Sequence, residues 1–362
     1  MGEAVITRGC IGGGNIGVSN ETKNSLGLNN NATMDDIIST LAFKDPSMAS
    51  VIVTVKSPVG TPIPNATVKM TPVEGAVLEY KCNNQGQCLF KTNAGQYNIQ
   101  ETNANGYIDI IPAALNNQPA VVGQVYQIDL TREGMTSVNL NKNQNIKFSS
   151  DIESVDVFVS GSGGGGGSGY VNVYGANRYA IAFYANDTTS YADIVDWTGI
   201  NRHHGASGGA GYTNSLKSFK PDINRNYNIA IYPGGSGGLN LGKSTQGSSA
   251  KGWAYSNIKY RFAPISSPLG SNGNSGGSVM FDNVLSATGG KGGIAAKEQG
   301  SSSVGGDGYT GNGASGGSYG YGKINLNCFV YEYWANCIAT SWCGGGSSGS
   351  SGYVILNNFT YK

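Results

Sequence analysis

The chain has 362 residues, of which 12% are charged and 57 are glycine, and its formal net charge is +1. So little charge argues against an electrostatic nucleic-acid binder and against disorder of the highly charged kind. The length leaves room for two or three domains. No apolar run approaches the length that crosses a bilayer. Residues 1–8 lack the apolar core of a signal peptide, so we expect no export by that route.

Residues 1–47 predict an N-terminal attachment arm that carries one short helix. The helix is expected over residues 33–43, where Thr33 can cap the first turn and two aspartates follow it. Pro46 favours an end to the helix just before it. One face of this helix is apolar, and its residues are Ile37, Ile38, Leu41 and Ala42.

Residues 48–132 predict a small β-sandwich that acts as a spacer. The apolar period changes to two after the helix, and turn residues recur at short, regular intervals. The expected strands are residues 51–55, 66–70, 78–82, 88–92, 96–100 and 125–130.

The six cysteines are too few for a disulfide scaffold in a chain of this length. Cys82 and Cys88 flank a predicted hairpin turn, where a disulfide bridge is sterically possible. Cys328, Cys337 and Cys343 lack the Cys-x-x-Cys spacing of a zinc site. We interpret all six as small apolar residues or free thiols.

Residues 133–362 predict a glycine-rich β domain, because strands repeatedly run into glycine patches. The pattern occurs at residues 155–169, 227–238 and 278–293. Val, Ile, Phe, Tyr and Trp interrupt the runs, which favours packed backbones over flexible linkers. No Gly-X-Y period exists, which excludes collagen. The runs are compatible with polyglycine-II-like segments lying side by side and hydrogen-bonding laterally.

Two motifs resemble known binding sites, one for nucleotides and one for metal ions, but their sequence context argues against both functions. Residues 237–244 match the P-loop pattern, but no helix is expected after them, so we interpret the match as chance. His203 and His204 are adjacent and would point to opposite faces of a strand. They read as a polar loop pair, although a ring of histidines in a symmetric trimer could hold a metal. We predict no catalytic residue, no metal site and no cofactor, and therefore no enzyme.

Three aromatic stretches between the glycine patches predict recognition loops. They span residues 191–204, 253–262 and 329–342. Exposed Tyr and Trp give large contact areas at little cost in entropy, and they stack on sugars or apolar epitopes. Local core packing or subunit contact is the alternative. The predicted receptor-binding residues are Trp197, Trp253, Tyr255, Tyr331, Tyr333, Trp334 and Trp342.

The spacer resembles a known type of module. The residues that carry this resemblance are Gly60, Pro62, Ile63, Asn65, Ala66, Val68, Asn84, Gly86, Gly95 and Tyr97. Through them, residues 49–131 are similar to the carboxypeptidase-regulatory-like, or Cna-B-like, β-sandwich modules, and the resemblance implies a stalk rather than a catalyst.

Residues 155–362 resemble the glycine-rich domains of bacteriophage tail fibres and tail-tip adhesins, through residues 157–167, 227–235, 285–293 and 344–355. The resemblance implies a virion protein, made in the host cytoplasm, that binds a bacterial surface glycan or protein non-covalently. The N-terminal arm would attach it to other tail or baseplate proteins, and a homotrimer is expected, with no nucleic acid and no membrane insertion. The alternative is a purely structural tail or fibre subunit; an enzyme that degrades surface polysaccharide ranks third.

Overall fold

The computed structural model describes most of the chain after residue 45. These residues form 26 strands in several sheets and no helix, so the all-β prediction is confirmed for them. The arm and the helix predicted over residues 33–43 lie outside this part. The described residues are 46–173, 179–182, 191–194, 200–239, 244–251, 258–260, 265–266, 269–296, 313–320, 322–331 and 334–362.

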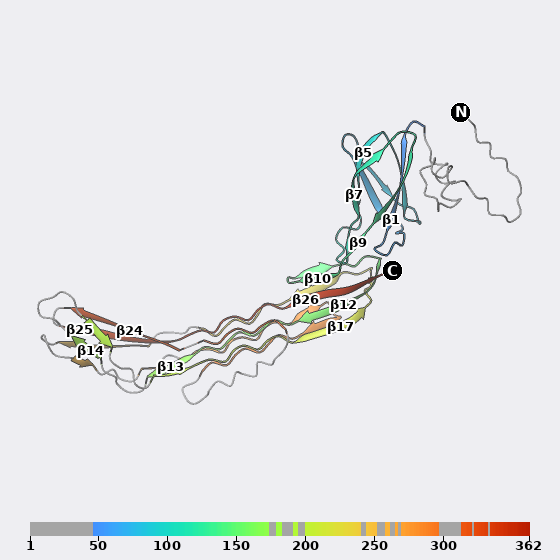
Figure 1. The fold of residues 1–362 in the computed structure, drawn as a ribbon. Helices are drawn as coiled ribbons and strands as arrows, with labels where there is room; N and C mark the ends of the chain where they lie inside the picture. Colours follow the sequence, from blue (N-terminus) through green and yellow to red (C-terminus); the bar gives the residue numbers. More distant parts are fainter. Residues whose placement is uncertain are drawn as a thin grey trace, which may run out of the picture. The chain divides into compact units, whose positions relative to one another are not determined.

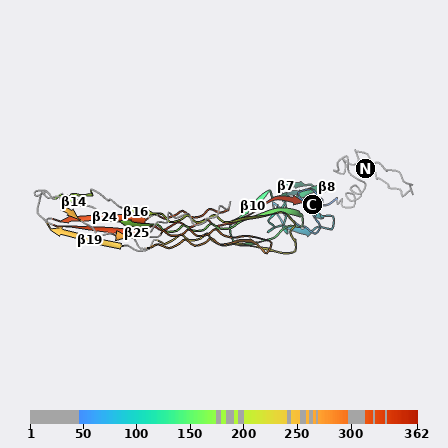
Figure 2. The same ribbon diagram turned by 90° about the horizontal axis from the view of Figure 1, so that it is seen from below.

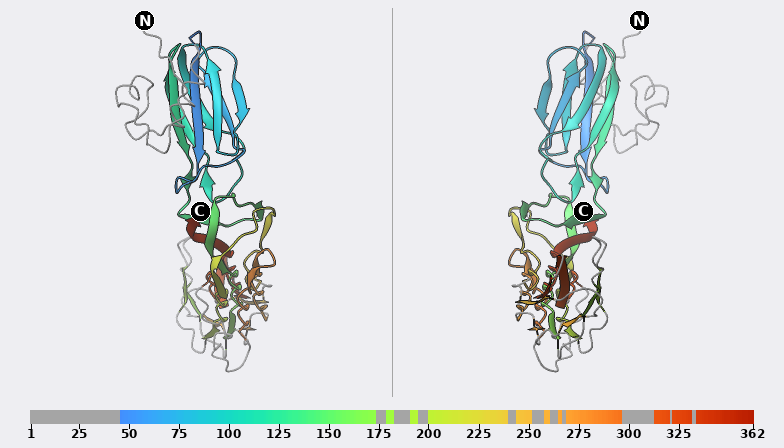
Figure 3. Two further views of the ribbon diagram at one scale, coloured as in Figure 1. Left: turned by 90° about the vertical axis from the view of Figure 1, so that its right-hand side faces the viewer. Right: turned by 90° about the vertical axis from the view of Figure 1, so that its left-hand side faces the viewer.

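The chain divides into two compact units. Unit 1 is Met1–Met135 with Tyr361–Lys362, and unit 2 is Thr136–Thr360. The strands of unit 1 form three sheets, ordered β4-β1-β8, β3-β2-β5-β7 and β6-β9 (Figure 3). Their bounds are β1 Ala49–Lys56, β2 Thr67–Pro72, β3 Leu78–Lys81, β4 Gln87–Thr92, β5 Gly95–Glu101, β6 Ile110–Ile111, β7 Ala114–Ala120, β8 Val125–Thr131 and β9 Glu133–Gly134.

The two larger sheets of unit 1 share one apolar core. Val51, Val53 and Val55 alternate along β1 and are all buried, as the period of two requires. Phe90 on β4 and Ile99 on β5 are fully buried in the same cluster, so side chains from both sheets meet there. β1 pairs with β4 in antiparallel and with β8 in parallel orientation.

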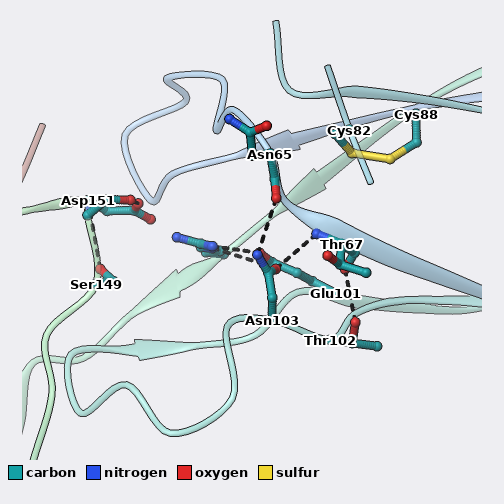
Figure 4. Close-up of polar contacts among 11 residues, drawn as sticks. Asn65, Thr67, Cys82, Cys88, Glu101, Thr102, Asn103, Ser149 and Asp151 are labelled. Carbon is teal, nitrogen blue, oxygen red and sulfur yellow. Dashed lines mark hydrogen bonds and ion pairs between the residues drawn. A yellow bond between two sulfur atoms is a disulfide. The ribbon is translucent and has the colours of Figure 1, made fainter. Parts of the chain in front are cut away.

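A buried ion pair and an exposed hydrogen bond also connect residues of unit 1. Nε and Nη2 of Arg132 donate hydrogen bonds to Oε2 and Oε1 of Glu101, at 2.9 and 2.5 Å. Both side chains are almost wholly buried. Asn103 accepts a hydrogen bond from the Thr67 amide at 2.9 Å (Figure 4). Such a pair satisfies its charges only while both partners are present.

Cys82 and Cys88 form a disulfide (Figure 4). The interpretation of all six cysteines as unbonded was therefore wrong for this pair. The turn between them brings their Cα atoms to 4.4 Å, because the Asn83 amide donates to the Gln87 carbonyl and closes it. Gly86 in the turn has φ +70°, and a Cβ there would crowd the backbone of Ile63.

Unit 2 contains the remaining strands. Its sheets are ordered β10-β26-β12-β17, β11-β18-β22-β23, β16-β13-β21, β15-β14-β20 and β19-β25-β24. The bounds are β10 Ser137–Leu140, β11 Gln144–Ile146, β12 Ile152–Ser160, β13 Tyr170–Val173, β14 Tyr179–Ala182, β15 Tyr191–Ile194, β16 Ile200–His203, β17 Thr213–Phe219, β18 Tyr227–Ile231, β19 Ser244–Lys251, β20 Ile258–Tyr260, β21 Ile265–Ser266, β22 Val279–Phe281, β23 Leu285–Ala287, β24 Gly322–Tyr331, β25 Trp334–Cys343 and β26 Tyr353–Tyr361.

Between these sheets lie seven glycine-rich segments, which we call the glycine bundle. Residues 161–169 form its centre, and every N–H of this segment donates to a neighbouring backbone carbonyl. Successive residues use three different neighbours in turn, so each neighbour is contacted at every third residue. The amides of Gly164, Gly165 and Gly166, for example, donate at 2.8 to 2.9 Å to the carbonyls of Gly209, Asn274 and Ser347.

Six segments surround the centre. Three of them run antiparallel to it and accept its N–H groups, and the other three run parallel and donate to its carbonyls, as Gly317 does to Gly164 at 2.8 Å. Each ring segment also hydrogen-bonds to both of its ring neighbours, which run in the opposite direction. In order around the ring the segments are residues 204–212, 288–296, 270–277, 232–239, 344–352 and 313–320.

The glycines of the bundle are needed for space. A Cβ on Gly164 would lie closer than 3.0 Å to the carbonyl oxygen of Lys291, and one on Gly165 would do the same to Ser236. The obstacle is backbone in each case, so it cannot rotate away. Larger side chains stand at outward positions of the ring, such as the exposed Leu239, whereas the centre carries only the small, buried side chains of Ser162 and Ser168.

Candidate functional site

The directions of the seven segments decide where their connections emerge. The centre ends at Gly169, and its antiparallel neighbour begins beside it at His204, so residues 170–203 leave and re-enter the bundle at one end. The same holds for residues 240–269 and 321–343. We call this the loop end, and the opposite end, beside Gly161, the sheet end. Figure 1 shows β13, β14, β24 and β25 at the loop end and β10, β12, β17 and β26 at the sheet end.

The sheet end is held by aromatic packing. Tyr227 stacks on Phe281 with ring centroids 5.4 Å apart, and Phe219 meets both rings edge-on. Phe148 adds a fourth ring 5.5 Å from Tyr227. These rings belong to both sheets of the sheet end, which makes that end a conventional apolar core.

The three loop-end connections interlock. Each of the three small sheets combines strands from two different connections, as the orders β16-β13-β21, β15-β14-β20 and β19-β25-β24 show. Figure 2 shows β14, β16, β19, β24 and β25 gathered at this end. In the described strands, each connection is therefore paired with strands of another connection. A rigid scaffold that presents joined loops at one end is a common arrangement for recognition surfaces.

The longest described feature of the loop end is the β24–β25 hairpin. Tyr331 and Trp334 are register partners at its turn, and Trp334 is also the register partner of Lys251 on β19. Because faces alternate with a period of two, Trp334 and Trp342 occupy one face of this sheet, together with Tyr331 and Phe329. The other face carries small and aliphatic residue types, among them Ala335, Ala339, Val330, Leu326 and Ile324.

Three of the seven predicted receptor-binding residues are thus placed, and all three fall on one sheet face. The polar residues that share this face were not predicted. The register adds Lys251, Asn325, Asn327 and Asn336 to the aromatic residues. The alternation of polar and apolar residues from Lys323 to Tyr331 is the signal that could have found them. Trp197, Trp253, Tyr255 and Tyr333 lie outside the described residues.

Exposed apolar side chains add to the chemistry of the loop end. Leu239, Leu269 and Ile294 are 61%, 59% and 46% exposed, and they stand at the loop end of three adjacent ring segments. On another side of the ring, His204 and Tyr319 face each other with ring centroids 5.4 Å apart. The described rim of the loop end therefore offers apolar and aromatic contacts.

The structure gives no support for a binding site at the P-loop match of residues 237–244 or at the pair His203 and His204. Ser244 begins strand β19, so the P-loop pattern is not followed by a helix, and the Gly238 amide already donates to the Gly166 carbonyl at 2.7 Å. The His203 ring lies 6.1 Å from that of Tyr170, its register partner. The described residues include no cluster of potential metal ligands. They also include no helix long and apolar enough to cross a membrane.

No protein-family model matches the chain, and a search of curated proteins finds no match either.

Proposed function

We propose that this chain is a virion tail-fibre adhesin that binds a bacterial surface receptor non-covalently through the loop end of its glycine bundle. One observation carries the proposal: the connections that contain all seven predicted receptor-binding residues emerge at the same end of the bundle. Aromatic residues with Asn and Lys on one sheet face suit a surface glycan, and equally an outer surface protein.

In this proposal the glycine bundle is a scaffold of polyglycine-II-like segments. The support is its hydrogen-bond period of three, which matches the three residues per turn of that helix, and the exposure of every third ring residue. Such a bundle holds its connections rigidly, so little conformational freedom is lost when a receptor binds. Unit 1 is proposed as a carboxypeptidase-regulatory-like β-sandwich spacer, supported by its two sheets and shared core, and the N-terminal arm as the attachment to other tail proteins.

The test is saturable binding of the full chain to candidate host cells, with the mass measured by light scattering. We expect Trp334→Ala together with Trp342→Ala to weaken binding by roughly thirtyfold or more, as the loss of a central aromatic contact does. The matched control is Tyr232→Ala, an aromatic side chain that is 52% exposed at the sheet end.

Binding that survives the double substitution in a folded chain would remove the β24–β25 face from the proposal. A folded wild-type chain that binds no host would favour the alternative, a purely structural tail or fibre subunit. Reducing sugar released from host glycan would instead identify an enzyme.

A further inference from the structure

Two cysteines of the loop end lie opposite each other in the β24–β25 hairpin. Cys328 on β24 is the register partner of Cys337 on β25. Two residues connect Tyr331 to Trp334 at the turn, and the cysteine pair follows three register positions farther along the hairpin. Their spacing in the sequence gave no reason to pair them, whereas the strand register places them directly across from each other.

The position of this pair in the ladder suits a covalent cross-link. In a hairpin with a two-residue turn, the residues that flank the turn form a hydrogen-bonded pair, and non-hydrogen-bonded pairs then alternate with hydrogen-bonded ones. Counted from Tyr331 and Trp334, the pair Cys328 and Cys337 falls on a non-hydrogen-bonded position. Partners at such positions have Cα atoms about 4.5 Å apart, a separation that a disulfide spans.

The two cysteines also share one face of the sheet. Because faces alternate with a period of two, Cys328 and Cys337 occupy the same face as Val330 and Ala335, opposite the face that carries Trp334. A bond between the cysteines would therefore leave the aromatic face chemically unchanged. It would still tie together the two strands that present this face.

We propose that Cys328 and Cys337 form a disulfide that staples the β24–β25 hairpin once the chain meets an oxidant, a small-molecule disulfide. The thiolate of one cysteine attacks a sulfur of the oxidant and releases one small thiol. The second cysteine then attacks the protein sulfur of this mixed disulfide and releases the other small thiol, so the oxidant takes up two electrons and two protons. The bond fixes the register of the hairpin, since a slip by one residue would move the cysteines out of opposition. This inference stands independently of receptor binding.

Peptide mapping of the full chain after incubation with oxidised glutathione tests the proposal. Free thiols are alkylated before digestion. Glu332 lies between Cys328 and Cys337, and Trp342 lies between Cys337 and Cys343, so cleavage after both residues gives each cysteine its own peptide. We expect the peptides of Cys328 and Cys337 to stay joined until a reducing agent is added.

Two variants sharpen the test. Cys337→Ser should leave Cys328 open to alkylation. Cys343→Ser is the matched control: the register partner of Cys343 is Gly322, so the link should persist without it. Hydrogen–deuterium exchange of the β24 and β25 amides should be about tenfold or more slower in the oxidised wild type than in Cys337→Ser. Equal exchange rates would overturn the stapling role.

The Cys82–Cys88 disulfide serves as the internal control for oxidation. If Cys328 and Cys337 are both alkylated in a sample in which this control bond has formed, the proposal is wrong. A bond from Cys328 to Cys343 would contradict the register on which it rests. A bond between two chains, seen as a dimer on a non-reducing gel, would assign the cysteines to a contact between copies and would also overturn it.

Discussion

Unit 1 and the glycine bundle of unit 2 are ordered by opposite means. In unit 1, side chains such as Phe90, Val53 and Ile99 fill the space between two sheets, and this side-chain packing holds the two backbone layers together. In the bundle, the centre contributes no side chain larger than serine, and the backbones themselves touch and hydrogen-bond. Close packing thus requires only that atoms fill space and that polar groups find partners, and glycine meets both requirements without an apolar core.

The largest expected effect breaks the bundle and leaves unit 1 intact. Gly165→Val would place side-chain atoms where the carbonyl oxygen of Ser236 lies, so the neighbouring segment must move away. We expect a loss of about 5 kcal/mol or more, enough to abolish the bundle. Calorimetry of the full chain should show one lost transition, while Ser348→Val, at an exposed ring position, keeps it. An unchanged transition in Gly165→Val would refute the close packing of the centre.

The next effect breaks unit 1 and leaves the bundle intact. Arg132→Ala removes one partner of a buried pair and leaves the Glu101 carboxylate uncompensated. We expect unit 1 to lose about 3–5 kcal/mol in denaturant unfolding. Lys56→Ala is the control, because its pair with Asp129 is exposed and should cost less than about 1 kcal/mol. Equal effects of the two substitutions would contradict the burial of the Arg132 pair.

A smaller effect is expected from removal of the Cys82–Cys88 disulfide, which should lower the stability of unit 1 alone. Cys82→Ser opens a loop of only a few residues, so the unfolded chain gains limited freedom, and we expect unit 1 to lose about 2 kcal/mol. A reducing agent should have the same effect on unit 1 of the wild type. The bundle transition should not move in Cys82→Ser, and a shift there would show that the two units unfold together.

The smallest expected effect is a loss of stability of unit 2 at acidic pH. Hydrogen bonds from Lys217, Asn358 and Ser218 lower the pKa of Asp156 from 3.8 to about 2. A carboxyl whose pKa is depressed on folding stabilises the fold above its unfolded pKa, and this contribution is lost as the pH falls through the folded value. Unit 2 should therefore lose up to about 1 kcal/mol between pH 4 and pH 2, since Lys217 is largely exposed. Asp156→Asn should flatten that part of the profile in pH-dependent melting, and an equally steep profile would exclude this role.

Most strands of unit 1 could be predicted from the local pattern of the sequence. Each of the six expected segments overlaps a strand, because alternation and turn residues are local signals. β7 was missed: it contains Pro119 and two adjacent asparagines, which strands tolerate at a sheet edge, and β7 is the edge of its sheet. In residues 278–293, where the sequence predicts a strand that runs into a glycine patch, the β22–β23 hairpin precedes the glycines, and it reverses at Asp282 with φ +48°.

The bundle and the candidate site were less accessible to sequence reasoning. Glycine runs indicated packed backbones, but which segments are neighbours depends on pairings more than a hundred residues apart, as between Gly163 and Ser350. Nothing in a glycine run distinguishes one such partner from another. The sequence indicated which aromatic stretches to consider, and only the segment directions placed their connections at a common end.

The hydrogen bonds of the bundle cross its long axis, and this has a mechanical consequence. A load applied at the loop end and resisted at the sheet end acts in shear on all seven segments at once. Separation then requires many bonds to break together, whereas a hairpin pulled open from its end loses them one after another. The bundle should therefore resist tension along its axis far better than its lack of a side-chain core would suggest.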